Sequence, residues 1–317
     1  MGDNWVDEYC KLMFPIDGSK CKIEEAKTLK FSHIPDHLYK FRKIDKYSLQ
    51  NLINDTIWLE TPSNYNDPYD CMINVNNTAD FRDRYLRRIS HEGKIKISSE
   101  EMAKLQELNF MEIVSYLLQK DPNTQAQQAN SVALYANNFV KEESHKIIDL
   151  LNNKTQNSIL ICSFSSKNTS ILMWSHYAEN HRGFCLEYNF KELGVEDILN
   201  CALQPVIYQD KLLDIDRYIL KSIDDIKTFN NLISVLFAMI KAEGWKYEDE
   251  WRMVLPLGSS YKPFNRTVPK PAAIYLGSKI SSDDEEMLLK IAKWKNIPSF
   301  RMKLDNTSFR MLKEPIK

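Results

Sequence analysis

The clearest change from apolar to polar positions along the chain lies in residues 158–189. Residues 159–162 form a continuous apolar run that is short enough for a strand buried on both faces. Because side chains alternate along a strand, the following Ser163 and Ser165 are predicted to share one face. Two small hydroxyl groups at the end of a buried strand would suit the floor of a ligand-binding site.

A helix and a second strand are predicted directly after this run. Apolar and aromatic residues recur at helical spacing over 172–178, and residues 184–188 form the next apolar strand. Trp174, His176 and Tyr177 lie in the predicted helix. Their rings are candidates for contact with a ligand, although aromatic residues at this spacing are equally typical of core packing.

Other segments carry the pattern of strands that would complete a sheet. Residues 38–42 alternate, so that Tyr39 faces one way and the terminal Arg42 faces the other. Asp45 can cap a helix that leads to a short strand at 56–59. Further predicted strands are 206–208, 272–276, 300–304 and 309–312.

Residues 61–70 are dense in proline, asparagine, aspartate and serine, which favour ordered turns. Tyr65, Asp67 and Tyr69 lie in this stretch. A rigid loop with two tyrosines could line a pocket. It could equally be only a rigid connector between elements of the core.

Residues 245–256 carry charged side chains at alternating positions. In strand geometry Glu248, Glu250 and Arg252 fall on one face. This face is either a polar site or the solvated side of an antiparallel strand. Just before it, residues 232–240 are apolar on nearly every face, which predicts a buried helix.

The order of these elements predicts one α+β domain over residues 31–317, with residues 1–30 as a peripheral segment. Its core would be one mixed or antiparallel sheet in which the strands of Arg42, Ser163 and Glu250 are neighbours. Residues 80–153 show charged helical patterns without a strand signal, so they are predicted to form a helical insertion. Such an insertion could cover a site, bind a partner or only add bulk.

Composition narrows the classes of function. The 317 residues include 42 basic and 43 acidic side chains, which gives no global field to attract nucleic acid or an anionic membrane. Six cysteines without Cys-x-x-Cys spacing predict reduced thiols. There is no signal-peptide pattern, no stretch apolar enough for a transmembrane helix, and no Rossmann or Walker motif among the 8 glycines. A cytoplasmic protein without a membrane partner is expected.

Four motifs stand out when these segments are taken together. They are Tyr39-Lys40-Phe41-Arg42, Asn66-Asp67-Pro68-Tyr69-Asp70, Met173-Trp174-Ser175-His176-Tyr177-Ala178 with His181 and Gly183, and Trp245 with Glu248, Glu250, Trp251 and Arg252. In this order they resemble a bacterial family catalogued as domain of unknown function 2971 (DUF2971). The resemblance covers residues 38–276 apart from the helical insertion, and the family label implies no reaction.

A second resemblance, to a family of enzymes, implies a particular reaction. Arg42, residues 163–165 and residues 248–250 resemble the Arg, Ser-Thr-Ser and Glu-x-Glu order of ADP-ribosyltransferases. Phe164 replaces the usual middle threonine, and the gap before Glu248 is unusually long. The resemblance implies that NAD is the substrate. The acceptor of ADP-ribose would be a nucleic acid or a protein, as for a bacterial toxin or a phage-defence effector.

This resemblance also implies roles for individual residues. Glu250 would stabilise the oxocarbenium-like ribose that forms when the nicotinamide–ribose bond breaks, and Glu248 would deprotonate the acceptor. Arg42 would hold the diphosphate, and Ser163 would orient the ribose. The candidate NAD-binding residues are Arg42, Ser163, Ser165, Tyr39, Tyr65, Asp67, Tyr69, Trp174, His176 and Tyr177.

Two other classes of function remain open. A metal-dependent hydrolase or nuclease would draw its ligands from His176, His181, Asp67, Asp70 and Glu187. On one helix the spacing of the two histidines would place their rings about 140° apart, so no metal is expected. A non-catalytic binding or regulatory module would use the polar residues as a structural network and residues 80–153 as its interaction surface. Bound metal in the purified protein and turnover of NAD would distinguish these classes.

Overall fold

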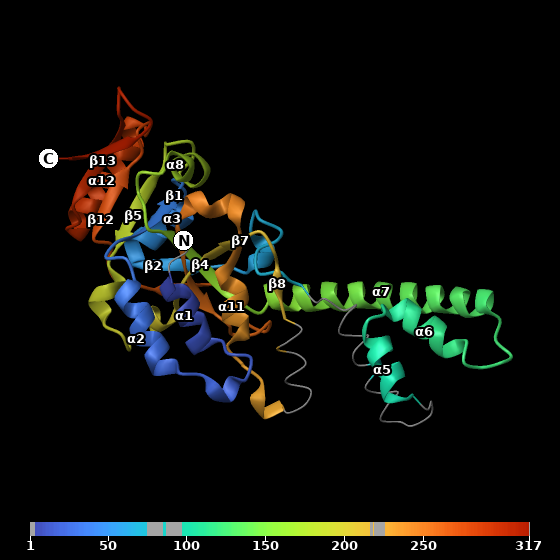
Figure 1. Ribbon diagram of the computed structural model, residues 1–317. Helices are drawn as coiled ribbons and strands as arrows, with labels where there is room; N and C mark the ends of the chain where they lie inside the picture. The colour runs from blue at the N-terminus through green and yellow to red at the C-terminus, as the bar shows by residue number, and fades with distance from the viewer. Residues whose placement is uncertain (1–3, 75–84, 87–96, 216–217, 219–225, 317) are drawn as a thin grey trace. The chain divides into compact units, whose positions relative to one another are not determined.

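The computed structural model describes residues 4–74, 85–86, 97–215, 218 and 226–316 (Figure 1). Contacts between residues divide the chain into two compact units. The first unit comprises residues 1–72, 154–212 and 227–317, and the second comprises residues 73–153 and 213–226. The predicted helical insertion at 80–153 therefore falls within the second unit, and residues 1–30 belong to the first.

An eight-stranded sheet forms the centre of the first unit, counted over its described residues. Strands β12 and β13 are parallel, whereas the other neighbours are antiparallel. The predicted α+β fold with a mixed sheet is thus confirmed. In spatial order the strands are β14 (Met311–Pro315), β13 (Ser299–Leu304), β12 (Ala273–Leu276), β5 (Phe184–Tyr188), β1 (Leu38–Arg42), β4 (Leu160–Ser165), β10 (Glu250–Leu255) and β6 (Leu203–Pro205).

Shorter elements surround this sheet. Strand β2 (Thr56–Leu59) pairs with β11 (Phe264–Thr267), and β7 (Ile207–Gln209) pairs with β9 (Ile240–Ala242). The described helices are α1 (Asn4–Met13), α2 (Ile23–His33), α3 (Lys46–Asn54), α8 (Ile171–Tyr177), α9 (Ile198–Ala202), α11 (Ile233–Met239) and α12 (Ser282–Lys295), with 3₁₀ turns η1 (Gly18–Lys20), η2 (Pro62–Asn64), η3 (Phe190–Leu193), η4 (Ile226–Thr228) and η5 (Glu243–Glu248). No helix in the described ranges combines the length and the hydrophobicity needed to cross a bilayer.

Apolar side chains of the sheet alternate between two cores. On one face Leu38, Phe164 and Met253 join a core that includes residues of α3, α9 and α12. On the other face Tyr39 and Phe41 pack with residues of α8. This alternation follows from the period of two along each strand, and it leaves the polar residues of β4 and β10 on the α8 side.

Residues 1–30, expected at the periphery, contribute to the interior of the first unit. The ring of Trp5 stacks on that of Trp251, with centroids 6.1 Å apart. The buried Tyr9 hydroxyl donates to the side chain of Gln204. Buried Lys30 donates to three backbone carbonyls at and just beyond the end of α9. Contacts with residues far along the chain therefore hold α1 and α2.

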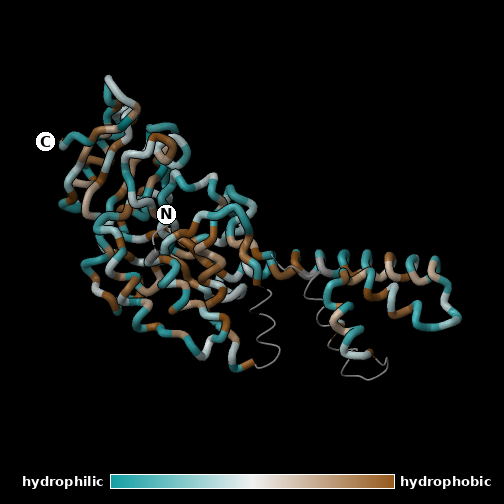
Figure 2. The backbone as a smooth tube through the Cα atoms, in the orientation of Figure 1, coloured by the Kyte–Doolittle hydropathy of each residue, from teal (hydrophilic) through white to brown (hydrophobic). Residues whose placement is uncertain are grey.

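The second unit is mainly helical in its described residues. Helices α5 (Ser99–Gln106) and α6 (Phe110–Leu118) each begin with a capping box, and a small apolar core includes residues of both. Helix α7 (Ala126–Gln156) carries hydrophobic residues along its length (Figure 2). Strand β3 (Ile73–Asn74) runs parallel to β8 (Leu213–Asp214). Residues 80–84 and 87–96 of the predicted insertion lie outside the described residues.

Gly183 lies where the chain passes closest to β1 before β5 begins. A Cβ atom at this position would be 2.1 Å from the carbonyl oxygen of Arg42. Glu179, Asn180 and His181 precede it with φ angles of 50°, 55° and 68°, so a left-handed turn brings the chain back from α8 to the sheet. Only glycine permits this close approach of the two backbones.

Gly183→Ala should lower the free energy of unfolding by about 1–3 kcal/mol, because the backbone of β1 must move to admit the new methyl group. Gly244→Ala is the matched control, since a Cβ atom there would meet no other heavy atom within 4 Å. Urea denaturation of both variants measures the difference. Equal stabilities would show that β1 and the start of β5 are not packed in this way.

Candidate functional site

A cavity of about 240 Å³ lies among β1, β4 and β10 in the first unit. Tyr39, Tyr65 and Tyr177 contribute aromatic walls. Its polar lining includes Lys40, Arg42, Ser163, Lys241, Glu248 and Glu250. Charged groups of both signs therefore meet aromatic rings in one enclosed space, which is typical of a ligand-binding site.

Strand register explains why distant residues meet here. Tyr39 of β1 pairs with Ser165 of β4, and Ser165 pairs on its other side with Glu250 of β10. Ser163 is opposite Arg252 in the same ladder. Directly opposed residues share a face of a sheet, so these side chains point to the α8 side. The predicted adjacency of the three strands is confirmed.

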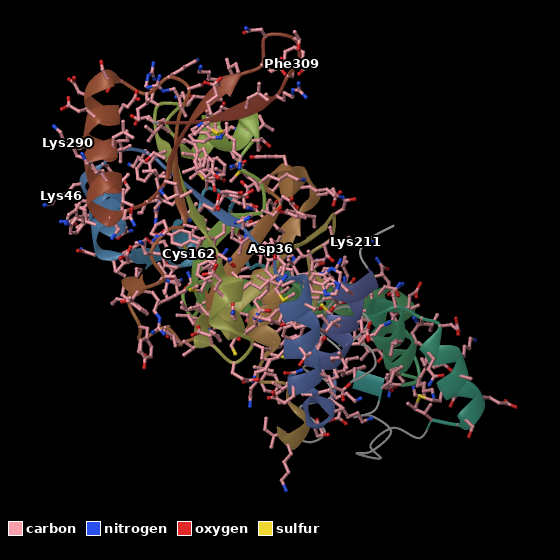
Figure 3. All side chains as sticks on the ribbon, turned by 90° about the vertical axis from the view of Figure 1, so that its left-hand side faces the viewer. Asp36, Lys46, Cys162, Lys211, Lys290 and Phe309 are labelled. Carbon is pink, nitrogen blue, oxygen red and sulfur yellow. The ribbon has the colours of Figure 1, made fainter. Side chains whose placement is uncertain are left out.

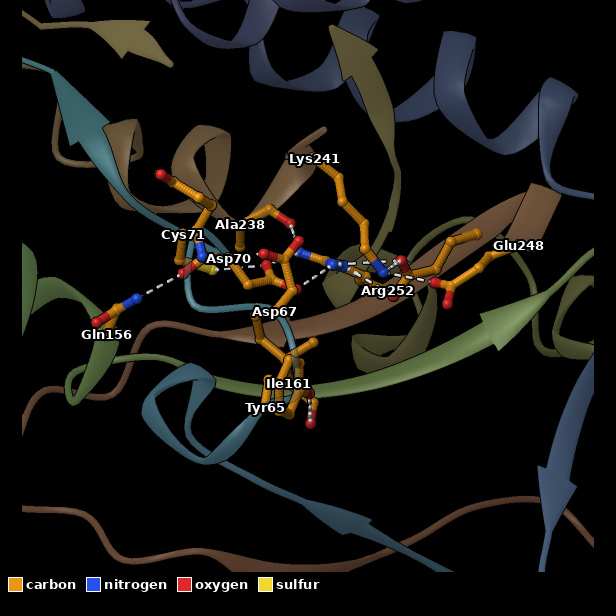
Figure 4. Close-up of polar contacts among 12 residues, drawn as sticks. Tyr65, Asp67, Asp70, Cys71, Gln156, Ile161, Ala238, Lys241, Glu248 and Arg252 are labelled. Atoms are coloured by element: carbon orange, nitrogen blue, oxygen red, sulfur yellow. Dashed lines mark hydrogen bonds and ion pairs between the residues drawn. The ribbon is translucent and has the colours of Figure 1, made fainter. Parts of the chain in front are cut away.

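Arg252 forms the centre of a buried polar network (Figure 4). Its Nη1 donates to Asp70 Oδ1 at 2.6 Å and to the Ala238 carbonyl at 2.8 Å. Its Nη2 donates to Asp70 Oδ2 at 2.7 Å and to Glu250 Oε2 at 3.2 Å. Nε donates to Glu250 Oε1 at 2.9 Å. All five N–H donors of the guanidinium are thus used, which is what allows this charge to stay buried.

Asp70 reaches the network from the ordered turn predicted at 61–70. Its amide donates to the carbonyl of Asp67 at 3.2 Å, and Gln156 Nε2 donates to the Asp70 carbonyl at 2.9 Å. Asp67 Oδ1 in turn accepts the amide of Tyr69 at 2.9 Å. The turn therefore serves to present one carboxylate to Arg252.

Lys241 joins the two glutamates of the later motif. Its Nζ donates to Glu248 Oε2, and to Glu250 Oε2 at 2.9 Å. Its ammonium also lies 5.0 Å from the centroid of the Trp245 ring. The Tyr177 hydroxyl donates to the other oxygen of Glu248 at 2.6 Å. A helix, a short strand and a 3₁₀ turn thus converge on the two carboxylates.

The two carboxyl groups differ in acidity although they share Lys241. Burial and the nearby Glu250 charge raise the pKa of Glu248, and Lys241 only partly offsets them. Burial would also raise the pKa of Glu250, but Arg252, Lys241 and a hydrogen bond from Ser163 outweigh it and hold that pKa well below the usual range. Glu250 is therefore the permanent anion of the pair.

The strand predicted at 245–256 begins later than expected. Residues Glu243–Glu248 form η5, and Asp249 then takes a left-handed conformation with φ of 47° before β10 starts at Glu250. Aspartate tolerates this conformation better than most residues, which explains why a single residue can redirect the chain. Glu250 and Arg252 share a strand face as predicted, whereas Glu248 reaches the site from the turn.

Some of the residues predicted for NAD binding line the cavity, and others do not. Those that line it are Tyr39, Arg42, Tyr65, Ser163, Ser165 and Tyr177. The other four do not line it. Trp174 packs edge-on against Phe41 in the core, and Asp67 accepts a hydrogen bond from the amide of Tyr69 within its own turn. Tyr69 and His176 are exposed.

Arg42 lies on the opposite face of the sheet from Glu250. It is three positions along β1 from Tyr39, and its partner Phe184 belongs to the core on the far side from α8. Yet Arg42 also lines the cavity, which therefore has walls from both faces. The expectation that Arg42 and Glu250 form one site from the same side of the sheet is therefore wrong, although Arg42 lines the same cavity.

The sequence pattern does not single out Lys241, and it predicts no role for Lys40 although that residue belongs to the first of the four motifs. Lys241 follows the apolar run 232–240, and a lone lysine at the end of such a run is the signal that could have indicated it. Lys40 alternates with Tyr39 and Phe41 in β1, so it has the appearance of a surface position. Its partner, the carbonyl of Ser163, is 123 residues away.

The possible metal ligands do not meet. His176 is exposed, whereas His181 is buried with its Nε2 3.1 Å from Ser175 Oγ. Asp70 is committed to Arg252, and Glu187 Oε1 lies 3.0 Å from His37 Nδ1. Among the residues that the structure describes, no three histidine, cysteine, aspartate or glutamate side chains are grouped so as to hold a metal ion.

A known protein family matches the part of the chain that carries much of this site. The model of the family described as "Protein of unknown function (DUF2971)" matches residues 173–253, a segment that runs from α8 to β10. This match supports the DUF2971 resemblance over the two later motifs, which include Tyr177, Glu248, Glu250 and Arg252, and it also spans Lys241. No curated protein and no solved structure matches the chain.

Arg252→Met should lower the free energy of unfolding by about 3–5 kcal/mol, because it leaves buried Asp70 without its cation and leaves buried Glu248 and Glu250 to share Lys241. Lys290→Met is the control, since Lys290 lies on the outer side of α12 with its side chain 73% exposed (Figure 3). Chemical denaturation of both variants provides the measurement. The prediction is wrong if Arg252→Met is no more destabilising than the surface control.

Proposed function

We propose that the cavity is the active site of an ADP-ribosyltransferase-like enzyme that consumes NAD. The observation that carries this proposal is the opposite pKa shift of Glu248 and Glu250, whose carboxylates bond the same Lys241 Nζ. Two carboxyl groups with separated pKa values suit two roles, one as a fixed anion and the other as a general acid or base. Transfer of ADP-ribose uses both, an anion beside the developing ribosyl cation and a base that takes the proton of the acceptor.

Glu250 is assigned the role of the fixed anion. Asp70, Glu248 and Glu250 face only two basic side chains in the network, Lys241 and Arg252, so the fully ionised group carries one net negative charge. In a buried site such a charge acts more strongly than in water. It would favour the cationic nicotinamide ring of NAD and the oxocarbenium-like ribose that forms as that ring leaves.

Glu248 is assigned the proton transfer. The nicotinamide–ribose bond breaks, and nicotinamide leaves with the bonding electrons. A hydroxyl or amine of the acceptor then bonds to the ribose carbon and gives its proton to Glu248. Tyr177 and Lys241 would hold the Glu248 carboxylate in place through their hydrogen bonds. Ser163, which bonds Glu250, is suited to orient the ribose beside that anion.

The acceptor would be a nucleic acid or a protein. Helices α5, α6 and α7 in residues 80–153 offer a surface for recognising it. An enzyme that consumes NAD in this way fits a toxin or a phage-defence effector acting in the cytoplasm, in agreement with the scattered cysteines, which are all free thiols.

One observation favours a second function, that of a non-catalytic binding or regulatory module. Glu250 accepts hydrogen bonds from Arg252, Lys241 and Ser163. A carboxylate offers about four acceptor sites, so few remain for a ribose hydroxyl. In this reading the network only stabilises the fold, and NAD or another ligand would bind without being cleaved.

Glu248→Gln should reduce nicotinamide release from NAD by about 10²–10⁴-fold, the usual contribution of a general acid or base. Folding should be retained, since glutamine keeps the shape and Lys241 keeps Glu250 as its partner. Glu243→Gln in the same 3₁₀ turn is the control, because Glu243 pairs only with the exposed Lys246 among described residues. Unchanged release by Glu248→Gln, with wild-type release measurable, would remove Glu248 from the mechanism.

The pH profile of kcat/KM, which reports the groups of the free enzyme, provides a separate test. A general base must be ionised, so activity should fall as pH drops below the raised pKa of Glu248, at a higher pH than the ordinary value of 4.5 would give. Glu250, with its lowered pKa, stays ionised across this range, so its titration causes no fall in activity within the profile. Initial rates over a series of buffers measure the profile. An acidic limb at or below the ordinary value would contradict the assignment.

A further inference from the structure

Strand β11 has an edge along which no described strand pairs. Its single neighbour among the described strands is β2. The amide of Val268 donates to the carbonyl of Asp55 at 2.9 Å, and the register of this pair continues along the whole of β11. Hydrogen-bonded and non-hydrogen-bonded pairs alternate in an antiparallel ladder, so the amides and carbonyls of Asn265 and Thr267 point away from β2.

The far side of β2 is already paired. Glu60, which follows β2, exchanges two backbone hydrogen bonds with Ile161 of β4, at 3.0 and 2.8 Å. Strand β2 therefore lies between β4 and β11, and the unpaired ladder positions of this small sheet are those on β11.

Strand β14, at one end of the eight-stranded sheet, has a different kind of edge. Its sequence includes Lys313, Glu314 and Pro315. Charged side chains and proline on an edge strand discourage the addition of another strand. Strand β11 contains no proline, lysine or acidic residue between Phe264 and Thr267. Its edge is thus open to pairing, whereas that of β14 is protected.

A groove with a volume of about 550 Å³ lies along β11. Its other side is formed by Leu193 at the end of η3 and by Ile198 and Leu199 at the start of α9. Leu193 and Ile198 are 36% and 60% exposed. Unpaired backbone groups beside exposed apolar side chains are the two features that recognise an added β-strand, the first through main-chain hydrogen bonds and the second through side-chain pockets.

Arg266 determines the charge of a suitable partner. It lines the groove and makes no hydrogen bond or ion pair with any residue in the described ranges. Asp197, the acidic residue of the groove, accepts instead from the amide of Leu199 at 2.8 Å. A second copy of this chain paired along β11 would bring two Arg266 side chains close together, so a partner of opposite charge is favoured.

We propose that β11 is a docking strand for an extended segment of a protein partner, which adds to β2 and β11 as a third strand. Directly opposed residues share a face, so partner residues opposite Phe264 and Arg266 would lie over the groove, and those opposite Asn265 and Thr267 would face solvent. The segment should therefore alternate, with apolar residues toward Ile198 and an acidic residue beside Arg266. This surface is independent of the proposed NAD chemistry, because β11 does not line the cavity of the carboxylates.

Selection of random peptides displayed on phage, with the full chain as target, tests this surface. Peptides enriched on the wild type should alternate apolar and polar residues and carry an acidic residue. Their synthetic copies should bind Arg266→Glu about tenfold more weakly or worse, as expected for loss of a charge-assisted hydrogen bond. Selection on Arg266→Glu should enrich basic peptides instead. Arg310→Glu is the matched control, since the Arg310 side chain is 66% exposed and paired with Asp305.

Thr267→Pro acts on the backbone rather than on charge. It removes an amide that points away from β2, so β2 and β11 keep their own hydrogen bonds while an added strand loses a donor. Thermal unfolding reports whether this variant is folded. In the free wild type, the amides of Asn265 and Thr267 should exchange with solvent faster than that of Arg266, and a bound peptide should slow them.

Each outcome bears on the proposal. Failure to enrich peptides on the wild type overturns it, as does a selected peptide that binds folded Thr267→Pro equally well or leaves the exchange of Asn265 and Thr267 unchanged. Equal weakening by Arg310→Glu would indicate non-specific attraction and overturns it too. If Thr267→Pro does not fold, Arg266→Glu and the amide exchange decide. A dimer of the wild type in sedimentation that Thr267→Pro breaks would replace the protein partner with a second copy.

Discussion

The site depends on one buried guanidinium whose donors are all used. Arg252 bonds a carboxylate of its own strand, a carboxylate from the turn that ends at Asp70, and the carbonyl of Ala238 near the end of α11. A buried arginine is tolerable only with such partners, because removing any one of them leaves an uncompensated charge. The same contacts hold Asp70 and Glu250 in place and so fix one wall of the cavity.

The chemistry of the cavity follows from this arrangement. Arg252 and Lys241 keep Glu250 ionised, whereas Glu248, whose pKa is raised, is held by Lys241 and by the hydroxyl donor of Tyr177. A purely structural network would have no need of a third carboxyl group with a raised pKa facing an open space. The raised pKa of that third group supports the proposed transferase, whereas the full coordination of Glu250 is equally expected of a binding module.

The sequence predicted local features better than relations between segments. Strands 38–42 and 184–188 are located to the residue, because the alternation of the first and the apolar run of the second are visible within a few positions. Alternation also predicts correctly that the side chains of Tyr39 and Arg42 point to opposite faces of their strand. Whether Arg42 shares a face with Glu250 depends on the register across three strands, which no single segment reveals. The pairing of Asp70 with Arg252 spans 182 residues, so local sequence patterns cannot predict it either.

The most direct test of the account is the fate of NAD with the wild-type protein. Labelled NAD is incubated with the full chain and with mixed protein and nucleic-acid acceptors, and released nicotinamide and transferred ADP-ribose are measured together. The account predicts release of nicotinamide with matching transfer of label to an acceptor or to water. NAD that binds in a calorimetric titration but stays intact under all of these conditions would contradict the transferase and leave the binding module as the function of this cavity.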